Sequence, residues 1–514
     1  MQHIQGISRH QLQVVSLEDT ISQENPVRFI DAFVHSINLD KIGFLARTLK
    51  SEGRPSFSTQ VFLKIYLYGY LNGIRSSRKL EKECLRNLEM QWLIEAIRPN
   101  YHSIADFRKD NPNALKQLFK LFVSFLKDSD LISGDIIAID GTKSRAHNSK
   151  KANFNQKKID KHLAYIEARS QEYLDQLEQN DIKDNPTVIS DIQQKIARLK
   201  QNKLRYELLE EQLKTSGEPQ VSTTDGDSRA LLVQGQVVEV SYNIQAAVDA
   251  KHNLVVATHT INRNDKNALS AIALEAKENL EAETFTVLVD KGYHNGREIE
   301  TCKNNNITTI VAHPDQGKSN ENGTQPEYFV SKFFYNKETD TYTCPQGQTL
   351  TTTGNWHKKT GRTDESGYQF KKYRTPNCRT CPVKEQCTSR KAGREIDRSQ
   401  YAEAVEDNHK RYKENPQLYR KRQEINEHIF GTIKRKWGYN YTDLIGLEKV
   451  NAEHSLIMLV YNIKRSINIL NVPDLIAKLK TWNSPYKSKV LFLLKTEYLK
   501  LKSAFIFGQT KIAV

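Results

Sequence analysis

The chain has 514 residues, of which 76 are Lys or Arg and 61 are Asp or Glu, so that its formal net charge is +15. Because a single hydrophobic core stops growing near ~250–300 residues, we expect more than one structural unit. The basic balance favours a polyanionic partner such as nucleic acid, although a merely soluble basic protein would show the same balance.

Two classes of location are disfavoured by the hydropathy pattern. No stretch approaches the ~18–20 apolar residues of a membrane span, and the richest short run covers only residues 456–461. The first six residues place no apolar segment behind a basic start, so no secretory signal is visible. We therefore expect a cytoplasmic protein with no membrane partner.

Residues 1–130 are expected to form a helical N-terminal domain for DNA binding or dimerisation. Leu118, Leu121, Phe122 and Phe125 repeat at helical spacing near its end. A Gly-containing turn around residues 73–79, rich in Arg and Lys, separates two helical patterns. This turn fits a helix-turn-helix that reads DNA, or a helical hairpin that only packs.

A strand and a helical hairpin are predicted next. Residues 131–153 contain the β-branched run Ile136-Ile137-Ala138-Ile139, which ends on Asp140-Gly141 and predicts a buried strand. Residues 154–218 are highly charged but carry apolar residues at steps of three and four, interrupted at Pro186. We interpret this segment as a helical hairpin insertion that serves as a spacer or a dimer arm.

Residues 219–312 alternate between strand and helix patterns. A β-hairpin is expected over 237–261, followed by a helix, a strand ending at Val289-Asp290, a helix near Tyr293 and a strand over 308–311. This order predicts an α/β fold with a mixed sheet packed by helices. Residues 401–470 are expected to add long helices, and residues 471–514 a basic helical tail.

Residues 313–400 form a Cys-rich insertion. Cys378, Cys381 and Cys387 lie close together in sequence, and Cys344 precedes them, so four thiolates could close a tetrahedral zinc site. His313 or His357 is an alternative ligand, and four unconnected buried thiols are the alternative to a metal site. The other two cysteines, Cys84 and Cys302, lie in helical patterns and are interpreted as packing residues.

Asp140 and Asp290 each end an apolar β-branched run and are followed within two residues by glycine. Burying an unpaired carboxylate is costly, so an acid in this position either caps backbone groups or binds a cation. Two such acids in one basic α/β domain favour a divalent metal site. Of the other acids nearby, Asp130 and Asp135 precede the first strand, and Asp249 and Asp265 are better explained as turn and cap residues.

The segment from Tyr419 through Arg422 and Glu427 to Lys434 resembles the Y-R-E-K signature of bacterial insertion-sequence DDE transposases, with the gap between Arg422 and Glu427 one residue longer than usual. The motifs at residues 139–142, 242–245 and 290–293 are also similar to that family. On the residues alone, Glu427 and Glu424 are rival candidates for the third acid. Either could instead simply pair with a basic neighbour along the helix. The resemblance selects Glu427.

The resemblance implies a ribonuclease H-like core in which Asp140, Asp290 and Glu427 hold two Mg²⁺ or Mn²⁺ ions. The implied activity is the cutting of element ends in double-stranded DNA and their joining to target DNA, by a homodimer or higher oligomer at the bacterial nucleoid. The implied DNA contacts are Tyr419, Arg422, Lys434, Arg435 and Lys143. Two alternatives stay open: a non-catalytic DNA-binding protein derived from a transposase, and a structure-specific DNA nuclease.

Overall fold

The computed structural model describes residues 10–12, 14–45, 56–181, 186–233, 237–314, 324–359, 367–483 and 486. They divide into two compact units. Unit 1 is formed by residues 1–264, 275–282 and 423–514, and unit 2 by residues 265–274 and 283–422. Two helices, α10 (Leu269–Leu280) and α14 (Pro416–Phe430), contribute residues to both units. Each unit is described by itself below.

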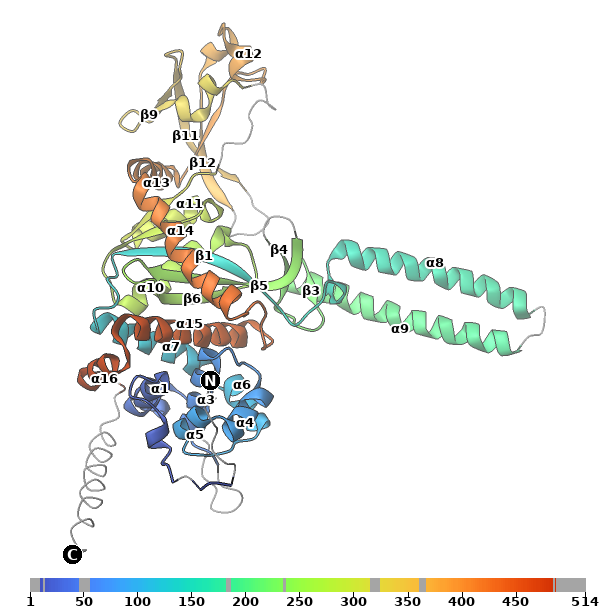
Figure 1. The fold of residues 1–514 in the computed structure, drawn as a ribbon. Coiled ribbons are helices and arrows are strands. Elements are labelled where there is room, and N and C mark those ends of the chain that lie inside the picture. The colour runs from blue at the N-terminus through green and yellow to red at the C-terminus, as the bar shows by residue number, and fades with distance from the viewer. Residues whose placement is uncertain are drawn as a thin grey trace, which may run out of the picture. The chain divides into compact units, whose positions relative to one another are not determined.

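Unit 1 begins with a group of helices that bury their apolar faces against one another (Figure 1). α7 shows why the helical prediction holds: Pro112 occupies its first turn, and Leu118, Phe122 and Phe125 form a buried stripe at spacings of four and three. The helices are α1 (Pro26–Ser36), α2 (Leu39–Ile42), α3 (Thr59–Leu71), α4 (Ser77–Arg86), α5 (Leu88–Leu93), α6 (Tyr101–Asp110) and α7 (Pro112–Asp128).

The sheet of unit 1 is built around one long strand. β5 (Val237–Asp249) pairs antiparallel with β1 (Ile136–Arg145), with β4 (Arg229–Val233) and with β6 (Leu254–Ile261). The predicted β-hairpin is therefore present as β5 and β6, and Asn253 in its turn adopts a φ of 55°. A short pair, β2 (Asn153–Phe154) with β3 (Val221–Ser222), leads into and out of the helical hairpin.

That hairpin consists of α8 (Gln156–Asp181) and α9 (Pro186–Ser216), which lie side by side in Figure 1. Its base has a small core of its own, in which Ile159 packs with Phe154, Leu209 and Leu213. Pro186 stands at the first position of α9, where its missing N–H costs nothing. The helical periodicity of this segment was therefore predicted correctly, and its architectural role stays a prediction.

The longest buried helix of unit 1, α15 (Leu447–Leu470), packs on α7, α3 and β6. Two of its asparagines satisfy backbone groups of β6: Asn462 Oδ1 accepts from Val255 N at 2.8 Å, and Asn462 Nδ2 donates to Val255 O at 2.8 Å. Eleven residues earlier, Asn451 Oδ1 accepts from Thr260 N at 2.9 Å. The helix thus hydrogen-bonds to an edge strand as a neighbouring strand would. α16 (Val472–Thr481) follows it.

Unit 2 contains a parallel strand pair, β7 (Phe285–Val289) and β8 (Ile307–Val311), joined through α11 (Gly296–Asn304). The short 3-10 turns η3 (Asp265–Asn267) and η4 (Lys291–Tyr293) lie before and between these elements. α13 (Ala402–Glu414) packs on β8, and its buried Asn408 accepts from Val311 N and donates to Val311 O, both at 2.9 Å.

The Cys-rich segment of unit 2 folds as an antiparallel sheet with its own small core, which includes Leu350, Tyr373 and Ile396. One short helix, α12 (Lys384–Cys387), lies in the same segment. The strands are β9 (Phe334–Asn336), β10 (Thr341–Thr343), β11 (Thr349–Lys359), β12 (Tyr368–Arg374) and β13 (Ile396–Ser399). The sequence analysis predicted no strands in this segment, in which most strands are short and rich in Thr, Lys and Tyr.

Antiparallel pairs in unit 1 and a parallel pair in unit 2, each packed by helices, confirm the expected α/β fold with a mixed arrangement of strands. Within the described ranges, no helix is long and apolar enough to cross a membrane. The predicted basic helical tail spans residues 471–514. Its first part is helical as α16, and residues 484–485 and 487–514 lie outside the residues that the structure describes.

Candidate active site and its basic neighbours

Asp140 lies in the middle of β1, where it faces Ala246 of β5 in the register. The sequence predicted that the strand ends at this acid. Instead the strand continues to Arg145, because pairing with β5 persists after the apolar run has ended. The half-buried carboxylate accepts from Gly141 N at 2.8 Å through Oδ1. The fully buried Ile137 and Ile139 fix the strand beneath it.

Lys434 joins the helix that carries Glu427 to the strand that carries Asp140. Its Nζ donates to Thr142 Oγ1 at 2.9 Å and to the carbonyl oxygen of Lys143 at 2.7 Å. Burial lowers the pKa of this lysine, and the charge of Lys143 lowers it further. The ammonium group of Lys434 is therefore hydrogen-bonded within unit 1, to a residue that lies two positions after Asp140. The motif around Asp140 includes Thr142, but no local signal showed that it binds a lysine 292 residues away.

Glu427 stands on the exposed face of α14, and so does its rival Glu424. The opposite face of the helix buries Ile425 and Ile429. A π-helical segment, Gly431–Lys436, follows directly. Because a π turn takes more residues than an α turn, Glu427 and Lys434, which are seven residues apart, do not share one face of a regular helix. Such π turns occur often at functional sites.

In unit 2, Asp290 follows β7 directly, as the apolar run predicted. Its carboxylate is about half exposed, and Arg422 approaches it with Nη2 3.8 Å from Oδ1. The guanidinium of Arg422 also lies 5.6 Å from the ring centre of Tyr419, and burial raises the pKa of this tyrosine. Three of the predicted residues, Asp290, Arg422 and Tyr419, are therefore neighbours.

The carboxylates are divided between the units, with Asp140 and Glu427 in unit 1 and Asp290 in unit 2. Across the part of the chain that the structure describes, no group of three or more His, Cys, Asp or Glu side chains is arranged to hold a metal ion. The oxygen ligands themselves are of the type that Mg²⁺ and Mn²⁺ prefer.

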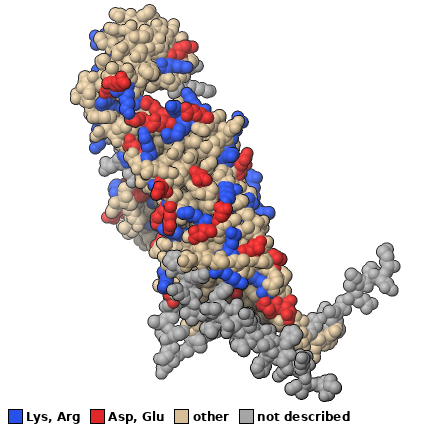
Figure 2. Space-filling view, turned by 90° about the vertical axis from the view of Figure 1, so that its left-hand side faces the viewer, with Lys and Arg blue, Asp and Glu red and all other residues tan. Residues whose placement is uncertain are grey.

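The remaining predicted DNA contacts differ in exposure. Arg435 is exposed and Lys143 is half-buried. On the face drawn in Figure 2, lysines and arginines are interspersed with acidic side chains and do not form one continuous basic surface. The excess of positive charge alone therefore does not delineate a DNA path on this face.

Arg75, in the turn between α3 and α4, has a structural role. Its Nη1 donates to the carbonyl oxygen of Tyr441 at 2.7 Å and to Glu453 Oε1 at 3.2 Å. Its guanidinium lies 4.5 and 4.4 Å from the ring centres of Tyr439 and Tyr441. Of the two alternatives for this turn, Arg75 fits the one in which the hairpin packs, because its side chain is buried in these contacts.

The four late cysteines are free and half-buried. Burial raises the pKa of Cys387, and the thiols of Cys378, Cys344 and Cys381 raise it further, so the four are close enough to interact electrostatically. Cys344 Sγ accepts from Gln348 N at 3.3 Å, in a turn completed by Gly347 with a φ of 74°. Cys84 and Cys302 are fully buried, as predicted for packing residues.

Comparison with known families assigns a class to this arrangement. Residues 15–110 match a family described as Transposase domain (DUF772), and residues 343–467 match one described as Transposase DDE domain. Both matches are to transposase families and support a transposase. The later match is to the DDE transposases in particular, the family that the segment around Glu427 resembles. No curated protein and no solved structure matches the chain.

Proposed function

We propose that this transposase cuts the ends of a DNA element and joins their 3′-hydroxyl ends to target DNA. Asp140, Asp290 and Glu427 would hold two Mg²⁺ or Mn²⁺ ions, which supply activation of the attacking oxygen and stabilisation of the leaving oxygen in an in-line displacement. The observation that carries the proposal is that the DDE-domain match contains Glu427 together with Tyr419, Arg422 and Lys434.

The other two acids lie outside both matched segments and rest on their own positions. Asp140 is held by a buried strand, and Asp290 follows another. In this proposal Arg422 orients Asp290 and neutralises part of its charge while the site is empty of DNA. Lys434 positions β1 relative to α14 through Thr142 and Lys143. Exposed Arg435 contacts the DNA backbone.

The four thiols would hold a structural Zn²⁺. Thiolates are suitable ligands, and the proposal is supported by the effect of the thiols of Cys378, Cys344 and Cys381, which raise the pKa of Cys387. Zinc would stabilise the small sheet β9–β13, whose core is limited to a few residues. We also propose that the protein acts on double-stranded DNA as a homodimer or larger oligomer at the bacterial nucleoid, because two element ends must be brought together.

The test uses duplex DNA taken from the ends of the element that encodes the chain, with Mg²⁺ present. D140N, D290N and E427Q should each abolish strand cleavage while leaving binding of the duplex intact. The matched controls are D135N, next to β1, and E424Q, three residues from Glu427, since both side chains are exposed. Full cleavage by any of the first three variants would overturn the assignment of that acid.

Two alternatives are separated by the same reagents. A non-catalytic DNA-binding protein would bind the ends tightly and cleave nothing with any divalent cation. A structure-specific nuclease would cleave but would fail to join a pre-cleaved end with a free 3′-hydroxyl to a plasmid. Joined products that require all three acids would exclude both.

A further inference from the structure

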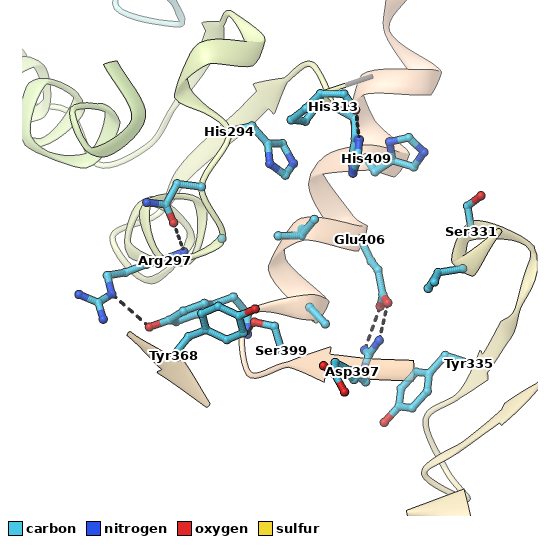
Figure 3. Close-up of a pocket in the computed structure, with 18 of the residues that line it drawn as sticks. His294, Arg297, His313, Ser331, Tyr335, Tyr368, Asp397, Ser399, Glu406 and His409 are labelled. Atoms are coloured by element: carbon cyan, nitrogen blue, oxygen red, sulfur yellow. Dashed lines mark hydrogen bonds and ion pairs between the residues drawn. The ribbon is translucent and has the colours of Figure 1, made fainter. Parts of the chain in front are cut away.

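A large cavity lies within unit 2, between α11, α13 and strands of the Cys-rich sheet (Figure 3). Its volume is about 1260 Å³. This is larger than the ~300–1,000 Å³ of common small-molecule pockets. None of the three proposed catalytic acids lines it. The cavity is therefore a separate feature that the proposed chemistry does not use.

One part of the wall presents flat rings. Phe334 on β9 is 70% exposed although it is a large apolar side chain, so its face is open to a ligand. The half-buried Tyr368, Tyr401 and Tyr412 also line the cavity, as does Tyr335, whose ring is covered on one face by the guanidinium of Arg398 at 3.6 Å. Exposed aromatic rings in a concave site are suited to stacking with planar groups, and each stacked nucleobase contributes ~1–3 kcal/mol.

The opposite side of the cavity carries three histidines that gather in Figure 3. Their ring centroids are 4.8 Å apart for His294 and His313 and 5.5 Å apart for His313 and His409. Burial lowers the pKa of His294 to about 4 and lowers that of His409 as well, so both are neutral at pH 7. His294 Nε2 and His409 Nδ1 are buried and have no hydrogen-bond partner among the described residues. These two nitrogen atoms could therefore form hydrogen bonds with a polar ligand in the cavity.

The charge of the lining is positive. Lys266 and Lys413 are exposed, and neither forms an ion pair within the described parts of the chain. Among the described residues, Arg297 donates to two neutral oxygens, Tyr401 Oη at 3.2 Å and Gly367 O at 2.8 Å. Of the two acidic lining residues, Glu406 is neutralised by Arg398, with Oε2 3.0 Å from Nη2, and the exposed Asp397 offsets only part of the remaining positive charge. The cavity therefore attracts an anion that also has flat, polar faces.

We propose that this cavity binds unpaired DNA, a segment of one to three nucleotides, as part of the substrate of the transposase; the proposal rests on the proposed function for the identity of that substrate. Bases lie against the tyrosines, Phe334 and the neutral imidazoles, and phosphates lie near Lys266, Lys413 and Arg297. Duplex DNA cannot use these rings in the same way, because its base faces are already stacked on one another.

The first experiment measures binding of a fluorescent eight-residue oligothymidylate to the full chain by anisotropy. The double variant F334A/K413E should weaken binding at least about tenfold, since it removes one stacking surface and reverses one charge. The matched control, W356A/K410E, changes an exposed aromatic residue and an exposed lysine outside the cavity and should bind within about twofold of the wild type. Equal weakening by both double variants would overturn the proposal.

A second experiment locates the oligonucleotide. With 5-iodouracil in the oligothymidylate, photocrosslinks should map to lining residues such as Phe334, Tyr368 or Tyr401, and crosslinks elsewhere would overturn the site. Equal binding of oligouridylate RNA would overturn the assignment to DNA. The probe contains no duplex, so its binding does not depend on end cleavage. Absence of end cleavage by the wild-type chain would contradict the proposed function but would leave the binding of the oligothymidylate unchanged. All four substituted residues are exposed, so thermal melts should coincide.

Discussion

Asn462 and Val255 exchange two hydrogen bonds of 2.8 Å, so a helix side chain serves both backbone groups of an edge-strand residue. Replacing Asn462 with leucine would leave the N–H and C=O of Val255 buried without partners. We expect a loss of about 3 kcal/mol in the free energy of unfolding, from the cost of two unsatisfied groups. Denaturant titration followed by circular dichroism measures it. The control is N468L, six residues along α15 at an exposed position, which should change stability by less than about 0.5 kcal/mol.

Lys434 and Arg435 should have separable roles although they are adjacent. K434M removes the hydrogen bonds to Thr142 and Lys143, so cleavage should fall about 10–100-fold while duplex affinity stays within a factor of about three. R435M should instead weaken duplex binding and reduce the slope of log affinity against log salt by about one. Affinities at several salt concentrations and cleavage at saturating DNA distinguish the two. The reverse pattern would assign the DNA contact to Lys434.

The buried pair of Arg75 and Glu453 links the N-terminal helices to α15. Glu453 is fully buried, and Asp443 N and Leu444 N also donate to it. R75M should destabilise the protein by about 3–5 kcal/mol, because it removes the nearest positive charge from a buried carboxylate. The double variant R75M/E453Q should recover part of that loss. A double variant no more stable than R75M would show that the packing of Arg75 on Tyr439 and Tyr441 dominates.

Acid should destabilise the N-terminal helices through Asp31. Burial raises the pKa of this carboxyl, but the hydrogen bond with His35 and the charge of Lys64, whose Nζ is 2.6 Å away, lower it to about 2. Since the folded value lies below the unfolded value near 3.9, the contribution is present above pH ~4 and is lost as the pH falls towards 2, about 2 kcal/mol in all. Urea midpoints from pH 5 to 2.5 check this. D31N should flatten that dependence, and an unchanged slope would contradict it.

Zinc removal should affect the Cys-rich sheet more than the rest of unit 2. Purified protein should contain one Zn²⁺ per chain by atomic emission, and C378S/C381S should contain none. Limited proteolysis should then cut residues 324–400 at least about tenfold faster. C302S is the control, because that thiol is buried in α11 away from the cluster. Wild-type protein free of zinc and equally resistant to protease would favour unconnected thiols.

Local patterns were sufficient for much of the fold. The β5–β6 hairpin, the α8–α9 hairpin and the strand before Asp290 follow from alternation, helical spacing and the positions of Pro186 and Asn253. These signals are contained within about ten to thirty residues of sequence. The pattern therefore predicted them without knowledge of what they pack against.

The site was less predictable because its key contacts join distant segments. The burial of Arg75 depends on Tyr441, and the role of Lys434 depends on Thr142, in each case hundreds of residues away. The π turn after Glu427 has no sequence signature that distinguishes Gly431–Lys436 from an ordinary helix end. The family resemblance selected Glu427 as the predicted acid, but only the tertiary structure shows which segments its helix contacts.

The hydrogen bonds from asparagines of α15 to β6 can form only after α15 has been synthesised. β6 ends at Ile261, whereas α15, which supplies Asn451 and Asn462, begins at Leu447. At ~5–20 residues per second, a ribosome needs roughly 10–40 s to make the intervening chain. During that interval the nascent protein exposes an unprotected strand edge on which other chains can assemble. A message truncated before α15 should therefore yield aggregates. By covering the edge of β6, α15 would keep the newly made chain from aggregating.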